Sequence, residues 1–239
     1  MRLLRGDGAL IRVGHRGAAA LAPENTLASF EAALAHGVDA IEFDVVDPGR
    51  GPLLVGHSLG ELGPSPPTLD EAVAFLAARG VRLHVDLKLS TRLDELAAAL
   101  RTHGVVERSV VSSFHLPSLR ALAEQAPDAR LGFTYPEDRY GVSRRRALRP
   151  AIRIGTAALR RAIVARIPGM IDRAGVQALM LQHAVVSRAA VERAHDLGAA
   201  VWAWTVDDEE EVARLDAAGV DAVISNDPRV FRGLATLAQ

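Results

Sequence analysis

The sequence lacks cysteine and long apolar runs, and only 4% of its residues are aromatic. Without cysteine, disulfides, thiolate nucleophiles and cysteine-based zinc sites are excluded, which leaves carboxylates and histidines as strong metal ligands. No stretch reaches the roughly 18 consecutive apolar residues that suggest a membrane-spanning helix. Residues 1–15 contain neither an uninterrupted apolar region nor a small-residue cleavage site. We therefore expect a soluble, cytoplasmic protein.

An excess of charge of either sign is also missing. The chain has 28 basic and 29 acidic residues, with a net charge of -1. This balance gives no support for nucleic acid as a partner. The function must therefore depend on a local site. The oligomeric state cannot be inferred from the sequence.

Short β-like runs and Ala- and Leu-rich helical segments alternate along the chain, and several helical segments end at glycine. This repeat favours parallel strands joined by helices in one domain over residues 1–239, closed as a (β/α)8 TIM barrel with a short, abbreviated insertion after the second strand. An open doubly wound sheet is the alternative, but no Gly-x-Gly-x-x-Gly follows the first strand. The predicted strands cover residues 9–14, 40–46, 82–87, 109–113, 130–134, 178–182, 200–206 and 222–225.

Two carboxylates occupy the second predicted strand, IEFDVV. Because strand side chains alternate, Glu42 and Asp44 share one face, while their apolar neighbours share the other. In a barrel, these carboxylates would point inward near the carboxyl end of the strand, where such barrels carry their chemistry. The next long strand adds Asp86 and Lys88 to the inward face. Buried carboxylates repel one another unless positive charge lies between them, so we expect a divalent cation, Mg²⁺ or Ca²⁺.

Further polar residues gather at the predicted carboxyl ends of strands. His15 and Arg16 follow the first strand, His57 follows the short run LLVG, and Asn226 follows the last strand. Two histidines can divide general acid and general base roles near neutral pH. Arg16 and Lys88 carry positive charge suited to a phosphate group. The combination indicates phosphoester chemistry.

The stretch HRGAAALAPENTLASFEAALAHGVDAIEFDV resembles the start of a glycerophosphodiester phosphodiesterase, in which HRG, PENT and E-x-D motifs follow in that order. The blocks PTLDEAV, VDLK, SSF, AVWAWTV and GVDAVISNDP match later parts of the family, so the resemblance covers nearly the whole chain. It implies a TIM barrel that uses one divalent cation, Mg²⁺ or Ca²⁺, to hydrolyse glycerophosphodiesters to glycerol 3-phosphate and an alcohol.

The resemblance also implies roles for individual residues. They are an acid/base pair (His15, His57), metal ligands (Glu42, Asp44, Asp86), phosphate contacts (Arg16, Lys88) and a pocket residue (Trp204). We interpret Glu24-Asn25-Thr26 as a helix start rather than as part of the site.

Two positions depart from the family pattern. The family usually has Glu where this chain has Asp86, and it has a His-Asp pair where this chain has His57-Ser58. The shorter Asp86 could change metal binding, and Ser58 removes a carboxylate that could orient His57. A catalytically weakened binding protein therefore stays open as an alternative. We expect the abbreviated insertion to leave the pocket open, and an open pocket would suit a second alternative, a lysophospholipase D-like enzyme whose substrate retains an acyl chain.

Residues 139–173 form a strongly basic stretch with a single acidic residue, Asp172. Apolar residues are interspersed, so the stretch could be a solvated helix on the barrel exterior. The alternative is a basic amphipathic helix in peripheral contact with an anionic membrane.

Overall fold

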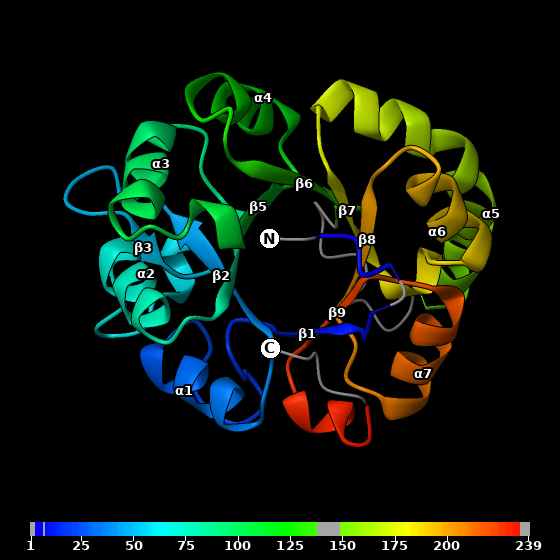
Figure 1. Ribbon diagram of the computed structural model, residues 1–239, viewed down its shortest axis with the longest axis horizontal. Coiled ribbons are helices and arrows are strands. Elements are labelled where there is room, and N and C mark those ends of the chain that lie inside the picture. Colours follow the sequence, from blue (N-terminus) through cyan, green and yellow to red (C-terminus); the bar gives the residue numbers. More distant parts are fainter. Residues whose placement is uncertain (1–2, 7, 138–148, 235–239) are drawn as a thin grey trace.

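The computed structural model describes residues 3–6, 8–137 and 149–234, although the side chains of 149–154 are not described. Nine strands make up its sheet: β1 (Ile11–Gly14), β2 (Ala40–Val46), β3 (Leu54–Val55), β4 (Arg82–Leu87), β5 (Ser109–Ser113), β6 (Arg130–Tyr135), β7 (Ala178–Gln182), β8 (Ala200–Trp204) and β9 (Ala222–Ser225). The order is β1-β9-β8-β7-β6-β5-β4-β2-β3, and β1 also pairs with β2. All pairings are parallel except that of β3, which lies antiparallel on β2. The parallel strands therefore close into a barrel, which confirms the predicted TIM fold (Figure 1).

Helices surround this barrel (Figure 1). The α-helices are α1 (Leu27–Ala35), α2 (Leu69–Ala78), α3 (Leu93–Thr102), α4 (Leu116–Gln125), α5 (Arg149–Ala174), α6 (Arg188–His195) and α7 (Glu209–Ala218). Short 3-10 helices are η1 (Leu59–Glu61), η2 (Val106–Arg108), η5 (His183–Val185) and η6 (Pro228–Phe231). The predicted strands agree with the observed ones to within two residues, apart from the short β3, because the period-2 pattern marks buried strands well.

Helix starts follow the capping signals in the sequence. Thr26 is the N-cap of α1 and forms a capping box with Ser29, and Thr68 forms one with Glu71 at α2. These side chains satisfy backbone N–H groups that have no partner within the helix.

Apolar side chains fill two regions. Outward-facing strand residues such as Ile41 and Phe43 pack against the helices, and the Phe43 ring lies 5.7 Å from that of Phe30 in α1. A smaller cluster that includes Val13 and Trp202 fills the amino-terminal half of the barrel interior. The inward-facing polar residues near the carboxyl ends of the strands therefore lie above an apolar floor.

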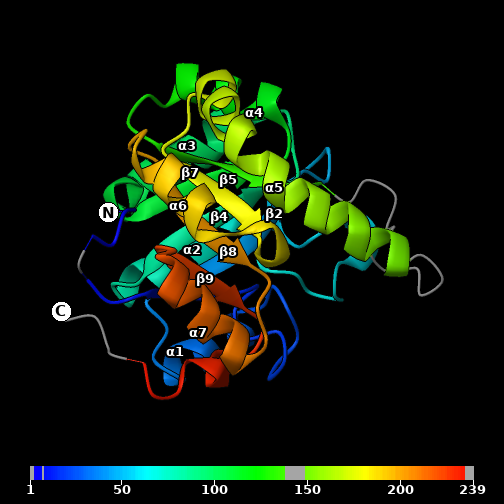
Figure 2. The same ribbon diagram turned by 90° about the vertical axis from the view of Figure 1, so that its right-hand side faces the viewer.

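Helix α5 runs past the barrel at the right of Figure 2. Its Ile163 and Ile167 are fully buried against the barrel, whereas Arg160 and Arg161 are exposed. Because these apolar residues pack inward, the described part of α5 matches the interpretation of a solvated exterior helix. The arginines of the basic stretch between 139 and 148 lie outside the described residues. No helix among those described is long and apolar enough to cross a membrane.

Candidate active site

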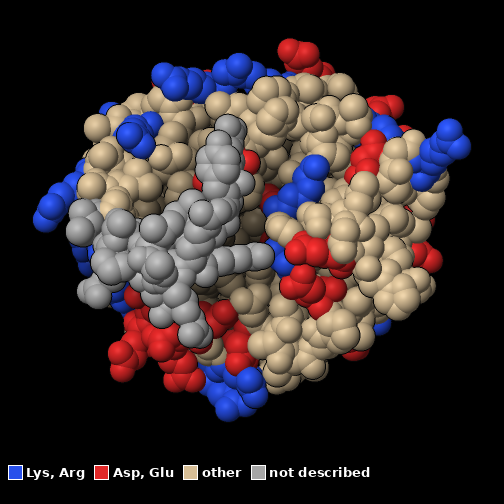
Figure 3. Space-filling view, turned by 180° about the vertical axis from the view of Figure 1, so that it is seen from behind, with Lys and Arg blue, Asp and Glu red and all other residues tan. Residues whose placement is uncertain are grey.

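A cavity of about 680 Å³ opens at the carboxyl ends of the strands. Acidic and basic side chains gather around the centre of this face (Figure 3). All eight predicted site residues line the cavity, although they come from five strands and the loops that follow them. These residues are His15, Arg16, Glu42, Asp44, His57, Asp86, Lys88 and Trp204.

The turn after β1 places His15 and Arg16. Arg16 has a φ of 51° and Gly17 a φ of 86°, so the chain bends through the left-handed region at two successive residues. A Cβ at Gly17 would lie 2.4 Å from Ser29 Oγ and 2.5 Å from the carbonyl carbon of Ser29. Only glycine fits between this turn and α1, which explains the third residue of the HRG motif.

Asp44 is the centre of the charge network and is 1% exposed. Its Oδ2 lies 3.0 Å from Arg16 Nε, and its Oδ1 lies 3.1 Å from Lys88 Nζ. Asn25 Nδ2 donates to Oδ2 at 3.0 Å, while Asn25 Oδ1 accepts from the backbone N–H of Asp44 at 3.1 Å. Although burial opposes it, the contacts with His57, Lys88 and Arg16 hold the pKa of Asp44 well below its usual value.

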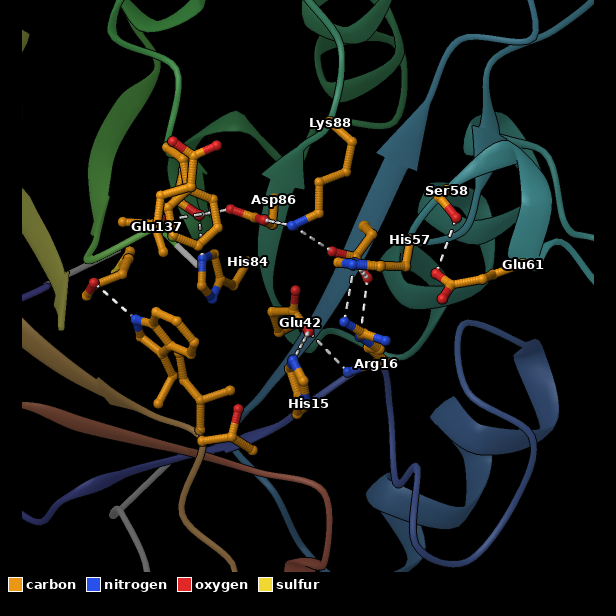
Figure 4. Close-up of a pocket in the computed structure, with 18 residues that line it drawn as sticks. His15, Arg16, Glu42, His57, Ser58, Glu61, His84, Asp86, Lys88 and Glu137 are labelled. Atoms are coloured by element: carbon orange, nitrogen blue, oxygen red, sulfur yellow. Dashed lines mark hydrogen bonds and ion pairs between the residues drawn. The ribbon is translucent and has the colours of Figure 1, made fainter. Parts of the chain in front are cut away.

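Asp86 lies on β4 and Lys88 directly follows this strand, and Asp86 lies beside Asp44 in the sheet register. Lys88 Nζ donates to Asp86 Oδ2, and Ser112 Oγ donates to Asp86 Oδ1 at 2.6 Å. Burial opposes the charge of Lys88, but the two aspartates outweigh burial and raise its pKa. The ammonium thus bridges two carboxylates on adjacent strands (Figure 4).

The carboxylate of Glu42 has fewer compensating positive charges and hydrogen-bond donors around it than those of Asp44 and Asp86. Its Oε2 accepts from the backbone N–H of Arg16 at 2.8 Å and lies 3.8 Å from His15 Nε2. Burial and the nearby charges of Asp44 and Asp86 raise the pKa of Glu42 well above its usual value. A positive charge brought near Glu42 would therefore favour its ionised form.

The described residues do not fit the three-carboxylate metal site that the resemblance implies. Among the parts of the chain that the structure describes, no group of three or more His, Asp or Glu side chains is arranged to hold a metal ion. Both oxygens of Asp44 and of Asp86 are already engaged by donors, and Lys88 lies between the two carboxylates. Here Lys88 and Arg16 supply the positive charge that we expected from a metal.

The two histidines are held differently. His57 Nδ1 accepts from Arg16 Nη2 at 3.0 Å and lies 3.5 Å from Asp44 Oδ2, so Asp44 provides a carboxylate beside the imidazole even though the next residue is Ser58. Ser58 Oγ instead donates to Glu61 at 2.9 Å. His15 Nδ1 lies 2.6 Å from Asn226 Oδ1. Burial, with a smaller contribution from the charge of Arg16, lowers the pKa of His15.

The opposite wall of the cavity is aromatic. The rings of Trp204 and Phe114 meet edge to face with their centroids 5.8 Å apart, and the Trp204 indole N–H donates to Met180 O at 2.8 Å. Glu137 lies on this side of the cavity, far from Ser58 and Glu61 (Figure 4). The cavity therefore joins a charged wall to an amphipathic one.

Sequence reasoning missed the contacts of two asparagines, Asn25 and Asn226. We assigned Asn25 to a helix start, but Thr26 is the cap and Asn25, with a φ of 57°, holds Asp44. Asn226 was noted at a strand end without its contact to His15. His84 also lines the cavity, and although its Nε2 contacts Ser112 Oγ at 2.8 Å, its buried Nδ1 has no hydrogen-bond partner among the described residues. The PENT and ISNDP blocks were the available signals for Asn25 and Asn226.

A TIM barrel whose strand ends bring together two imidazoles, an arginine, a lysine and buried carboxylates has the features of an enzyme that acts on phosphate esters. The chain belongs to the glycerophosphoryl diester phosphodiesterase family, whose model matches residues 15–47 and 67–230. The match omits residues 48–66, which include His57. The equivalence of His57 to a family histidine therefore depends on spacing and geometry.

Relatives and solved structures agree with this membership. A glycerophosphodiester phosphodiesterase of Caldanaerobacter subterraneus is 26% identical over 93% of this chain and 96% of its own. A crystal structure of a glycerophosphodiester phosphodiesterase from Agrobacterium tumefaciens is 21% identical, covers 93% of this chain and 98% of its own, and gives a TM-score of 0.72. An Oleispira antarctica phosphodiesterase, solved in complex with the product sn-glycerol-3-phosphate, is 22% identical with a TM-score of 0.68, covering 92% of this chain and 94% of its own.

Proposed function

We propose that this protein hydrolyses glycerophosphodiesters to glycerol 3-phosphate and an alcohol, with His15 and His57 as the acid/base pair. The observation that carries the proposal is that both imidazoles share one cavity with Arg16 and Lys88, in a chain of this family. The two cations attract the phosphate and stabilise the negative charge that develops on its oxygens. A Lys ammonium has three N–H donors, so the contacts of Lys88 with Asp44 and Asp86 leave one for substrate.

The first experiment measures release of glycerol 3-phosphate from glycerophosphocholine and glycerophosphoethanolamine. We expect His15→Ala and His57→Ala each to reduce kcat about 10² to 10⁴-fold, the range for loss of a general acid or base. His183→Ala is the matched control, because His183 contacts Glu211 at 2.7 Å and does not line the cavity. Equal turnover by wild type and both site variants would refute the assigned roles.

Metal dependence stays a prediction. The family generally uses a divalent metal, and the same assay with EDTA, Mg²⁺, Ca²⁺ or Mn²⁺ tests whether this chain requires one. Glu42, Asp44 and Asp86 would have to rearrange to bind it, because Lys88 now bridges the aspartates. Turnover that EDTA does not reduce would remove the metal from the proposal and leave the two cations as the source of positive charge.

A lysophospholipid is the second candidate substrate, favoured by Leu59. This side chain is 54% exposed and lies between Ser58 and Glu61, which line the cavity. Parallel assays with lysophospholipid and water-soluble diesters separate the two substrates.

Peripheral binding to anionic membrane through residues 139–173 is tested by co-sedimentation with anionic vesicles, comparing wild type with R160E/R161E. If diester binds without turnover, the protein is the weakened form suggested by Ser58 and Asp86.

A further inference from the structure

Asn226 contacts His15, although the family resemblance assigns no role to Asn226. It follows β9, and its Oδ1 lies 2.6 Å from His15 Nδ1. The backbone fixes the relative position of the two residues, since the His15 N–H donates to Ser225 O at 2.7 Å and Asn226 O accepts from Ala20 N–H at 3.1 Å. The contact is therefore built into the closure of the barrel, where β9 pairs with β1.

Asp207 determines which way the Asn226 amide points. Its Oδ2 accepts from Asn226 Nδ2 at 2.7 Å, and its Oδ1 accepts from the Asn226 backbone N–H at 2.8 Å. An ionised carboxylate only accepts hydrogen bonds, so the side-chain NH₂ of Asn226 must face Asp207. The amide oxygen of Asn226 is then the atom that faces His15.

An amide oxygen also only accepts, so His15 Nδ1 must be the donor and must carry a proton. In the neutral imidazole, the other nitrogen is then unprotonated. This nitrogen, Nε2, is the one that lies 3.8 Å from Glu42 Oε2. In Figure 4, His15 points toward the charged centre of the cavity beside Glu42.

We propose that Asn226, oriented by Asp207, is a positioning residue that fixes His15 in the Nδ1–H tautomer, so that Nε2 is the nitrogen that exchanges a proton with substrate. Without an acceptor at Nδ1, the proton of the neutral ring is free to occupy either nitrogen and the ring is free to turn. The catalytic consequence rests on the proposed diesterase activity, but the tautomer does not.

The direct test is a ¹⁵N–¹H correlation spectrum of protein labelled in its histidine rings, recorded at about pH 8, where an ordinary imidazole is neutral. The His15 signals are assigned as those lost in His15→Gln. We expect a protonated Nδ1 and an unprotonated Nε2 for His15. A protonated Nε2 with an unprotonated Nδ1 would overturn the proposal, whatever the activity of the protein.

Variants test the contribution of each partner. Asn226→Leu removes the acceptor, and we expect loss of the single His15 tautomer together with a fall in kcat of about 10- to 100-fold at little change in KM, as for other groups that orient a functional imidazole. Ser225→Ala is the matched control. It removes a different hydrogen bond to Asp207, of 2.9 Å, and leaves the contact with His15 intact. Asn226→Leu with unchanged tautomer and kcat would refute the proposal.

A charge exchange provides the rescue. Asn226→Asp alone places two carboxylates side by side, whereas N226D/D207N lets the new amide at 207 donate to the new carboxylate at 226, which accepts from His15 Nδ1. We expect the double variant to recover the tautomer and most of kcat relative to N226D. A double variant no better than N226D, with thermal unfolding like wild type, would contradict the proposed orientation. Absence of diesterase activity in wild type would refute the proposed function instead.

Discussion

At the scale of single residues, the site is a balance of buried charges. Asp44 is 1% exposed and is contacted by Arg16, Lys88 and Asn25. Removal of one partner from a buried charge is costly because the remaining charge stays desolvated. Lys88 is also the only lysine in the sequence.

We expect Lys88→Met to lower the free energy of unfolding by about 3 kcal/mol at pH 7. The sign of the pH dependence follows from Asp44, whose pKa is lowered in the folded state by Lys88 among others. Its stabilising contribution is present above the unfolded value of 3.8 and is lost as pH falls below it. The deficit of the variant should therefore stay constant from pH 7 to about pH 4 and shrink as the pH falls further, measured by urea unfolding. A deficit independent of pH would point to lost packing instead.

At the scale of elements, the turn after β1 and the helix α1 must approach closely to place His15. Gly17 has a φ of 86°, a Cβ at this position would overlap the backbone of Ser29, and Ser29 Oγ donates to Arg16 O at 2.7 Å. The HRG motif is thus partly a packing requirement: the glycine lets α1 lie against the turn that carries the histidine and arginine.

Gly17→Ala should destabilise the protein by about 3 kcal/mol, which combines the cost of a left-handed alanine with that of overpacking. Gly37→Ala is the matched control, because Gly37 has a φ of 74° but open space where the Cβ would be. We expect Gly37→Ala to cost only about 1 to 2 kcal/mol. Urea unfolding measures both, and equal losses would show that crowding at Ser29 is unimportant.

At the scale of the whole molecule, the two ends of the barrel have different tasks. The carboxyl ends of the strands carry the cavity, whereas Asp221, fully buried just before β9, ties together the opposite end. Its carboxylate accepts from the backbone N–H groups of Arg5 and Val201 at 2.8 Å each and contacts His195 Nε2 at 2.8 Å. The segment around Arg5, the start of β8 and the end of α6 therefore share one anchor.

Asp221→Asn should lower stability by about 2 to 4 kcal/mol, because it weakens several buried hydrogen bonds at once. We expect kcat of the folded enzyme to stay near the wild-type value, since Asp221 lies at the end of the barrel away from the cavity. Thermal unfolding and steady-state kinetics on the same preparation separate the two effects. A large loss of kcat with normal stability would show that the two ends are coupled.

The sequence by itself determined the barrel and the strand face on which the charged residues of the cavity lie. Alternation along residues 40–46 assigned Glu42 and Asp44 to the inward face, and the same pattern placed Asp86 and Lys88 beside them. These predictions succeeded because side-chain direction in a strand follows from position alone. The match of the family model confirms the resemblance drawn from HRG, PENT and E-x-D.

Only the tertiary structure decided which charges meet. Asn25 reaches Asp44 across 19 positions of sequence, and Asn226 reaches His15 across 211. No local sequence pattern predicts either contact, because each depends on how loops from different strands meet at the rim of the closed barrel. For the same reason, the sequence could place three carboxylates on one face but could not tell that Lys88 would lie between two of them. Strand register fixes faces, whereas the distances among side chains are set by closure of the barrel and by the balance of buried charge.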